Sequence, residues 1–166
     1  MNTTVLTKQH NRKKFNCGTP ALDTYLKNTA RQHLERGISR TYVLTDENTT
    51  TDIIGYHTLT LSEVHAPIGS SLHNKYPHKL PSLKIARLAV DSQYQGRGIG
   101  GYLLADVMQK ALQAHEVAPL IGIIVDAKNQ KAKDFYLPYG FLEAAGEEDE
   151  LYLWLPMKTI TDAMDS

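Results

Sequence analysis

The strongest constraint in this sequence is a glycine-rich turn between an apolar strand and an apolar helix. Residues 83–90 have the composition of a strand, and Gln-Gly-Arg-Gly-Ile-Gly follows at residues 95–100. Beyond the turn, apolar residues recur at helical spacing: Ile99, Leu103, Leu104, Val107, Met108, Ala111 and Leu112. A helix that begins directly after such a turn presents unpaired backbone N–H groups at its positive end. The pattern therefore indicates a site for phosphate oxygens.

The glycines alone do not identify a ligand. Gly96, Gly98 and Gly100 let a phosphate approach the backbone, but alternating glycines also form ordinary flexible turns. No Gly-Lys-Ser/Thr follows, which excludes the phosphate loop of nucleoside triphosphatases. The acidic residue that a dinucleotide-binding fold carries on its second strand is also missing. From these residues alone, phosphate binding and a plain turn both remain open.

The chain around this turn alternates predicted strands and helices. The continuous apolar run at residues 120–125 predicts a strand buried on both faces, which a helical crossover joins to residues 83–90. β-Branched and aromatic residues at 41–44 and 53–61 predict a hairpin. Further strands are expected at residues 4–7 and 151–155. The elements predict an α/β or α+β domain with helices packed on a central sheet.

The predicted helices outside the crossover have recognisable ends. Thr19 and Pro20 open one helix, which continues to Gly37, because a cap residue, a first-turn proline and a terminal glycine occur in that order. A second helix is expected from about Lys128 to Leu137. Residues 66–82 contain three prolines and no clear period, which predicts a long surface loop with a binding role.

Length and composition predict one globular domain that spans residues 1–166. A chain of 166 residues can bury one substantial core. No apolar run approaches the ~20 residues of a membrane helix, and the N-terminus lacks the pattern of a signal peptide, so we expect a cytoplasmic protein. The single cysteine, Cys17, excludes an internal disulfide. The histidines lack zinc-binding spacing, and those on the predicted strand and loop are expected to have no partners. No metal is expected.

Two motifs resemble those of the GNAT superfamily of N-acetyltransferases. Residues 95–100 match its pyrophosphate loop, Gln/Arg-x-x-Gly-x-Gly/Ala, in the proper place after a strand. A second stretch, Asn-x-x-Ala-x-x-Phe-Tyr-x-x-x-Gly-Phe, is matched by Asn129, Ala132, Phe135, Tyr136, Gly140 and Phe141. The resemblance implies the GNAT fold, a mixed sheet of six to seven strands with helices on both faces, and acetyl-coenzyme A (acetyl-CoA) as co-substrate. It implies these cofactor-binding residues: Leu88, Ala89, Val90, Gln95, Gly96, Arg97, Gly98, Ile99, Gly100, Gly101 and Asn129.

Tyr136 occupies the motif position of a proton donor. When an amine attacks a thioester, the leaving thiolate gains from a donor such as a phenol, whose pKa is near ~10. The alternative role for Tyr136 is that of an aromatic residue packed in the core. Tyr139, three residues later, matches a packing position of the family. We therefore take Tyr136 as the candidate catalytic acid.

A catalytic base is harder to find. An alkyl ammonium, with a pKa near ~10, must lose a proton before it attacks. Residues 83–87 contain no acid, and Glu63 and Asp91 are weak candidates expected at the surface. An α-amine, with a pKa near ~8 and lower beside an ester, is already largely neutral near pH 7. Either a base lies elsewhere, or the acceptor is such an α-amine.

A narrower resemblance favours the α-amine. The chain is similar to GNAT toxins of bacterial toxin–antitoxin pairs, which acetylate the α-amine of the amino acid on charged tRNA and so block translation. The similar segments are residues 15–18, 22–26, 30–32, 37–44, 55–59, 87–90 and 125–128. The resemblance implies charged tRNA as acceptor, a ribbon-helix-helix antitoxin as partner, and a homodimer.

The charge balance departs from those toxins. They are usually basic, whereas 18 basic and 18 acidic residues cancel in this chain. A local basic face is still expected, with Arg87, Lys84 and Arg36 as candidate RNA contacts. Cys17 is predicted to be a small buried residue and not a nucleophile. The alternatives to a toxin are an ordinary acetyltransferase of small-molecule or protein amines and a non-catalytic acyl-CoA-binding regulatory module, against which Tyr136 counts.

Overall fold

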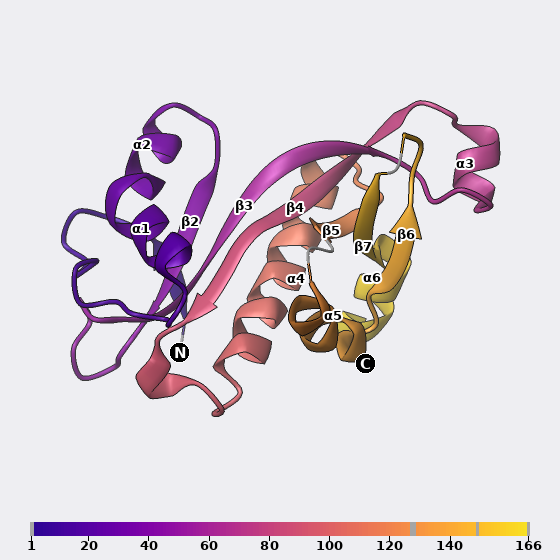
Figure 1. Ribbon diagram of the computed structural model, residues 1–166. Coiled ribbons are helices and arrows are strands. Elements are labelled where there is room, and N and C mark those ends of the chain that lie inside the picture. Colours follow the sequence, from indigo (N-terminus) through magenta and orange to yellow (C-terminus); the bar gives the residue numbers. More distant parts are fainter. Residues whose placement is uncertain (1, 127–128, 149, 166) are drawn as a thin grey trace. The chain divides into compact units, whose positions relative to one another are not determined.

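The computed structural model describes residues 2–126, 129–148 and 150–165. Within them, seven strands form one mixed sheet in the order β1-β2-β3-β4-β5-β7-β6 (Figure 1). The strands are β1 (Thr3–Val5), β2 (Arg40–Thr45), β3 (Ile53–His65), β4 (Lys79–Val90), β5 (Gly122–Asp126), β6 (Leu142–Ala145) and β7 (Leu151–Pro156). The helices are α1 (Pro20–Asn28), α2 (Ala30–Glu35), α3 (Ser71–Lys75), α4 (Ile99–Val117), α5 (Gln130–Tyr136) and α6 (Met157–Asp165). The predicted mixed sheet of six to seven strands is confirmed.

The chain divides into two compact units. The first unit comprises residues 1–60 and 85–107, and the second unit comprises residues 61–84 and 108–166. β3, β4 and α4 each pass from one unit into the other. The expectation of a single domain over residues 1–166 stays a prediction. No helix among the described residues is both long enough and apolar enough to cross a membrane.

In the first unit, β2 pairs with β1 and β3 in antiparallel fashion, which confirms the predicted hairpin. α2 packs beside β2, and α1 packs against α2 (Figure 1). The ring of Phe15 meets that of Tyr56 edge-on at 5.5 Å within the core. Gly55 of β3 is required by close packing, because a Cβ there would lie 3.0 Å from Leu103 of α4 and 3.2 Å from the carbonyl oxygen of Ala89.

The helix predicted from Thr19 to Gly37 is broken into α1 and α2. Thr29, a β-branched residue with a weak helix preference, takes φ −124° and ψ −37° between them. The predicted end is correct. Gly37 has φ +70°, and the N–H of Ile38 donates to the carbonyl of His33 at 2.9 Å, as in a glycine-terminated helix.

In the second unit, β4 pairs with β5 in parallel, at Leu83 with Ile123, which confirms the predicted crossover connection. β5 and β7 pair in antiparallel fashion, as do β7 and β6, and α6 packs against β5 and β7 (Figure 1). Ile123 and Ile124 are both buried, as expected of a strand covered on both faces.

Residues 66–82 do not form one long loop, and this prediction is wrong. α3 lies within the segment, and β4 begins at Lys79. The hydroxyl of Ser70 caps α3 by accepting a bond from the N–H of His73 at 3.2 Å, a local interaction that apolar periodicity does not reveal. Pro81 is tolerated in β4 because its carbonyl still accepts from the N–H of Ile121 at 2.9 Å.

The two ends of the chain also differ from expectation. β1 ends at Val5 instead of Thr7, and β7 is not the last element, because α6 follows it. Met157 and Ile160 of α6 are buried. β6 was not predicted. The helix expected at 128–137 is α5, and Lys128 lies outside the described residues.

Candidate active site

The glycine turn is open on its outer side. Gly96 and Gly98 both have φ +79°, a left-handed conformation that glycine adopts without strain. A Cβ built at either residue meets no atom within 4 Å. The backbone of the turn is therefore accessible to a ligand, as phosphate binding requires.

The N-terminus of α4 completes this site. Its first helical hydrogen bond joins the N–H of Tyr102 to the carbonyl oxygen of Gly98, at 3.1 Å. The N–H groups of Ile99, Gly100 and Gly101 precede this bond and have no partner within the helix. α4 is 19 residues long, so its positive end favours an anion at this position. These groups fit the pyrophosphate of acetyl-CoA.

The side chain of Gln95 fixes the turn. Its amide Nε2 donates to the carbonyl oxygen of Cys17 and to that of Val90, both at 2.9 Å. The amide thus ties the turn to the end of β4 and to the loop before α1. This contact positions the backbone of the turn, while direct contact between Gln95 and the cofactor stays a prediction.

β4, the turn and α4 bring most of the predicted cofactor residues into one segment of the first unit. Leu88, Ala89 and Val90 end β4 directly before the turn, and Ala89 is buried in the core. Arg97, within the turn, places its guanidinium 5.4 Å from the ring centroid of Tyr94. Residues 88–90 and 95–101 therefore lie in one short stretch of chain, which the bond from Gln95 to the carbonyl oxygen of Val90 holds together.

Asn129 and Tyr136 lie at opposite ends of α5 in the second unit. The side-chain oxygen of Asn129 caps α5 by accepting from the N–H of Ala132 at 2.8 Å. Tyr136 is 6% exposed, and its ring packs against Phe135 and Phe141 at centroid distances of 4.9 and 5.2 Å. Burial raises the pKa of Tyr136 well above its ordinary value, so the phenol keeps its proton near neutral pH.

The hydroxyl of Tyr136 forms no hydrogen bond with any other described residue. The hydroxyl is therefore available to bond to a ligand atom, which fits a proton donor to a leaving sulfur. Tyr139 differs, because it is 46% exposed and its ring packs 5.6 Å from that of Phe135.

The two weak base candidates differ in their surroundings. Asp91 was expected at the surface, but it is only 9% exposed. Its carboxylate accepts from the N–H groups of Asn16 at 3.1 Å and Gln93 at 3.0 Å, so it holds the backbone around the glycine turn. Glu63 is exposed, as expected.

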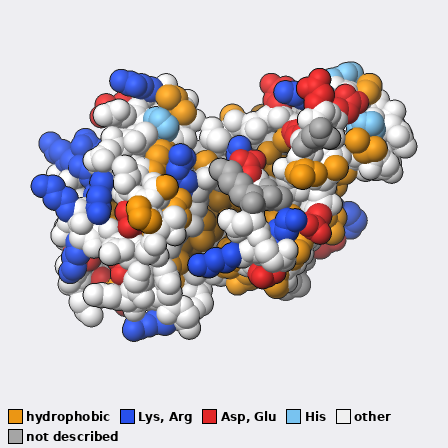
Figure 2. Space-filling view, viewed as in Figure 1, with side chains coloured by type: hydrophobic (Ala, Val, Ile, Leu, Met, Phe, Trp, Pro, Cys, Tyr) orange, Lys and Arg blue, Asp and Glu red, His pale blue; other side chains and the backbone are white. Residues whose placement is uncertain are grey.

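The three candidate RNA contacts have different surroundings. Lys84 is paired, with Nζ 3.2 Å from a carboxylate oxygen of Asp126. Arg36 ends α2 and is exposed. The guanidinium of Arg87 lies 3.5 Å from the ring centroid of Tyr25. Figure 2 shows Lys and Arg side chains gathered over the elements of the first unit, in agreement with the expected local basic face.

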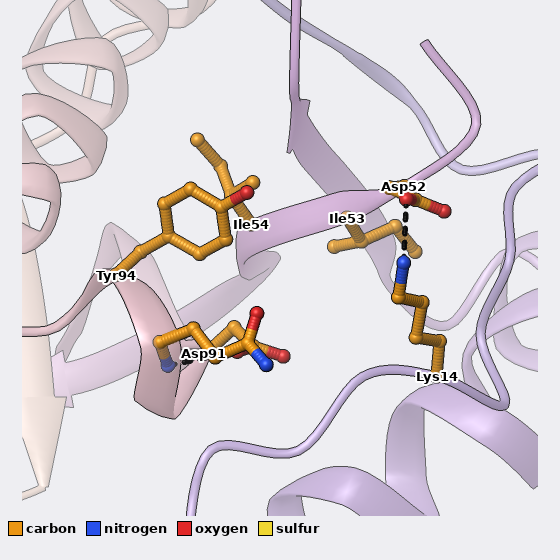
Figure 3. Close-up of a pocket in the computed structure, with 7 residues that line it drawn as sticks. Lys14, Asp52, Ile53, Ile54, Asp91 and Tyr94 are labelled. Atoms are coloured by element: carbon orange, nitrogen blue, oxygen red, sulfur yellow. Dashed lines mark hydrogen bonds and ion pairs between the residues drawn. The ribbon is translucent and has the colours of Figure 1, made fainter. Parts of the chain in front are cut away.

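A small pocket lies beside the glycine turn in the first unit. Figure 3 shows Tyr94 and Ile54 on one side of it and Lys14 with Asp52 on the other. The ammonium of Lys14 lies 2.9 Å from the Asp52 carboxylate. The pocket volume of about 50 Å³ suits a few water molecules. It is too small for a coenzyme and is not the acetyl-CoA site.

The sequence missed several polar contacts of the histidines, which were expected to lack partners. In the first unit, Nε2 of the buried His57 lies 2.7 Å from a carboxylate oxygen of Asp106. In the second unit, the contacting pairs are His65 with Glu150 and His73 with Glu147, each at 3.4 Å. Because His57 and Asp106 are 49 residues apart in sequence, no local pattern could pair them. Cys17 is buried, as predicted.

Comparison with known proteins agrees with this geometry. A tRNA-acetylating toxin of Mycobacterium tuberculosis (strain ATCC 25618 / H37Rv) is 33% identical over 145 residues, which cover 87% of this chain and 84% of the relative. The solved structure of AtaT complexed with acetyl-methionyl-tRNAfMet has a TM-score of 0.88 at 30% identity, with 98% of each chain covered. A tyrosine-to-phenylalanine variant of AtaT, bound to the C-terminus of the antitoxin AtaR and acetyl-CoA, has a TM-score of 0.82 at 29% identity, with 99% of this chain and 98% of that chain covered.

The family assignment rests on most of the chain. Residues 12–141 match the Acetyltransferase (GNAT) family. This range contains the glycine turn, the start of α4, Asn129 and Tyr136. The chain therefore belongs to the GNAT family of acetyltransferases.

Proposed function

We propose that this acetyltransferase transfers the acetyl group of acetyl-CoA to the α-amine of an aminoacyl-tRNA, and that it acts as the toxin of a toxin–antitoxin pair. The structural observation that carries the donor assignment is the open glycine turn with the unpaired N–H groups of Ile99, Gly100 and Gly101. The acceptor assignment is supported by the relatives, one of which is a tRNA-acetylating toxin and another of which was solved with acetyl-methionyl-tRNA.

The reaction is a direct attack. The lone pair of the neutral α-amine adds to the thioester carbonyl carbon, the C–N bond forms, and the C–S bond breaks. Tyr136 donates its proton to the leaving sulfur, the nitrogen releases one proton to solvent, and the Tyr136 phenolate then takes one proton from solvent. No carboxylate base is required, because an α-amine beside an ester is largely neutral near pH 7. This agrees with the engagement of Asp91 by two backbone N–H groups.

The cofactor-binding and RNA-binding residues remain part of the proposal. The backbone of residues 88–90 and 95–101 and the side chain of Asn129 bind acetyl-CoA, and Arg87, Lys84 and Arg36 face the RNA. Among these three, Arg87 is the strongest candidate, since the charge of Lys84 is already balanced by Asp126. A basic contact that neutralises a phosphate also makes the affinity depend on salt.

The proposed partners follow from the same role. AtaT was solved with the C-terminus of the antitoxin AtaR, and we extend this to a ribbon-helix-helix antitoxin for this chain. We also propose a homodimer and a cytoplasmic location, where charged tRNA is found.

The deciding experiment uses labelled acetyl-CoA and total charged tRNA with the purified chain. Label is expected on the aminoacyl group, released as an N-acetyl amino acid after mild alkaline cleavage of the ester. Deacylated tRNA is the control and should stay unlabelled. Label that appears only on free amines or on protein would establish the ordinary acetyltransferase instead. Acetyl-CoA binding without turnover on any amine would establish the non-catalytic module.

A further inference from the structure

Arg87 occupies an inward position on β4. Side chains two residues apart along a strand share a face, so Arg87 lies on the face of Ile85 and Ala89. Both of these neighbours are buried, with 1% and 5% exposure. Arg87 itself is only half-buried. A cation at such a position loses hydration and is normally compensated by an acid.

Within residues 2–126, 129–148 and 150–165, no acid provides that compensation. Arg87 forms no ion pair or hydrogen bond with any other described residue. Its contact is the ring of Tyr25 on α1, whose centroid lies 3.5 Å from the guanidinium carbon. The aromatic face attracts the cation but accepts none of its N–H groups. The guanidinium therefore keeps its hydrogen-bond donors for a ligand.

The ring of Tyr25 is held in a fixed orientation. Its hydroxyl lies 2.9 Å from the hydroxyl of Ser39 and 3.1 Å from Nδ1 of His33, and the side chain is 5% exposed. The rings of Tyr25 and His33 also meet edge-on at 5.4 Å. Contacts from α2 and from the residue before β2 thus support the ring on which Arg87 rests.

We propose that Arg87, stacked on Tyr25, binds a phosphate group of the acceptor RNA through two parallel N–H bonds, with the ring of Tyr25 as the positioning group. A planar guanidinium suits the bidentate recognition of phosphate. This inference rests on the proposed function, because it assigns the phosphate to the tRNA acceptor.

The position of Arg87 favours the RNA over the cofactor as the source of the phosphate. Arg87 precedes Val90, the last residue of β4, by three residues, or about 10 Å of extended strand. The free N–H groups that fit the pyrophosphate begin at Ile99, beyond the end of the strand. Arg87 therefore lies beside the segment assigned to the acetyl-pantetheine arm, back along β4 from the N–H groups that fit the pyrophosphate.

The test compares Arg87→Gln, Arg87→Lys, Tyr25→Leu and Tyr25→Phe in the full chain. The control is Lys158→Gln, which removes one charge from an exposed pair with Asp162. KM for charged tRNA, kcat and the Kd of acetyl-CoA are measured for each, together with the salt dependence of binding to uncharged tRNA. We expect Arg87→Gln to raise KM about tenfold and to reduce the log–log salt slope by about one, with the Kd of acetyl-CoA unchanged.

The Tyr25 variants separate positioning from folding. Tyr25→Leu should approach the KM of Arg87→Gln, whereas Tyr25→Phe keeps the ring and should recover most of the wild-type KM. Arg87→Lys keeps the charge but loses the planar guanidinium, and we expect an intermediate KM. If Arg87→Gln does not fold, the KM of Arg87→Lys tests the phosphate contact instead.

An unchanged KM in the Arg87 variants would overturn the inference while leaving the proposed function intact. A weaker Kd for acetyl-CoA in Arg87→Gln would also overturn it, because the phosphate would then belong to the cofactor. Failure of the wild-type chain to acetylate charged tRNA would refute the proposed function and this inference together.

Discussion

Replacing Tyr136 by phenylalanine removes one hydroxyl group and keeps the aromatic ring in place. The ring is 94% buried, as its 6% exposure implies, and it packs against Phe135 and Phe141. The hydroxyl donates to no other described residue. The substitution therefore removes no hydrogen bond among the described residues and leaves no cavity larger than one oxygen atom. It isolates the chemical role of the phenol from its packing role.

The two roles predict opposite outcomes. Loss of a positioned proton donor lowers kcat by about 100- to 1000-fold, which corresponds to about 3–4 kcal/mol of transition-state stabilisation. Loss of a hydroxyl without a protein partner changes the free energy of unfolding by only ~0.5 kcal/mol, or roughly 2 °C in Tm for a chain of this size. Burial raises the pKa of Tyr136, so the wild-type donor stays protonated throughout the neutral range.

The assay is single-turnover transfer of labelled acetyl to charged tRNA between pH 6.5 and 9, with Tm and the Kd of acetyl-CoA measured in parallel. The matched control is Tyr139→Phe, which changes an exposed tyrosine three residues away and should leave the rate within twofold of wild type. A Tyr136→Phe chain with wild-type kcat would refute the assignment of Tyr136 as the acid. A fall in rate that merely follows a large fall in Tm would assign Tyr136 to packing instead.

Three further predictions concern stability and the cofactor site. In thermal melts, Gly122→Ala should lower the free energy of unfolding by about 3 kcal/mol or more, because Gly122 has φ +146° and a Cβ there would collide with the carbonyl oxygen of Leu155. The control is Gly69→Ala, at φ +88° with no atom within 4 Å of the added Cβ, which should lower the free energy of unfolding by only about 1 kcal/mol. Gln95→Leu should weaken acetyl-CoA binding about fivefold by calorimetry, because the turn loses both carbonyl contacts, and an unchanged Kd would show that the turn holds its shape without them. Burial, with a smaller contribution from Glu150, raises the pKa of Tyr152 to about 12, so the folded state binds this proton more tightly than the unfolded chain. The resulting stabilisation is present below pH ~10 and is lost as the pH rises toward 12. In denaturant titrations, Tyr152→Phe should remove about 1 kcal/mol of this alkaline loss of stability, after discounting for solvent screening.

The sequence by itself determined the structure of the segment that we propose as the cofactor site. Residues 83–112 carry their structure in local patterns, because a strand, a glycine turn and an amphipathic helix each follow from neighbouring residues. The end of α2 at Gly37 was also local, since a left-handed residue at a helix terminus favours glycine. The Tyr136 motif was found by its resemblance to the family pattern, which lies within one short stretch of chain.

Only the tertiary structure decided features that depend on residues far apart in sequence. Asp91 was expected at the surface, but Asn16, 75 residues away, donates to it and accounts for its burial. Arg87 rests on Tyr25, and no pattern in β4 or α1 announces that contact. The break at Thr29 and the small helix α3 depend on single side chains that periodicity does not detect. The periodicity of apolar residues shows which face of a helix or strand is buried. Which residues contact that face depends on packing between segments far apart in sequence, and the proposed phosphate contact of Arg87 depends on such packing against Tyr25.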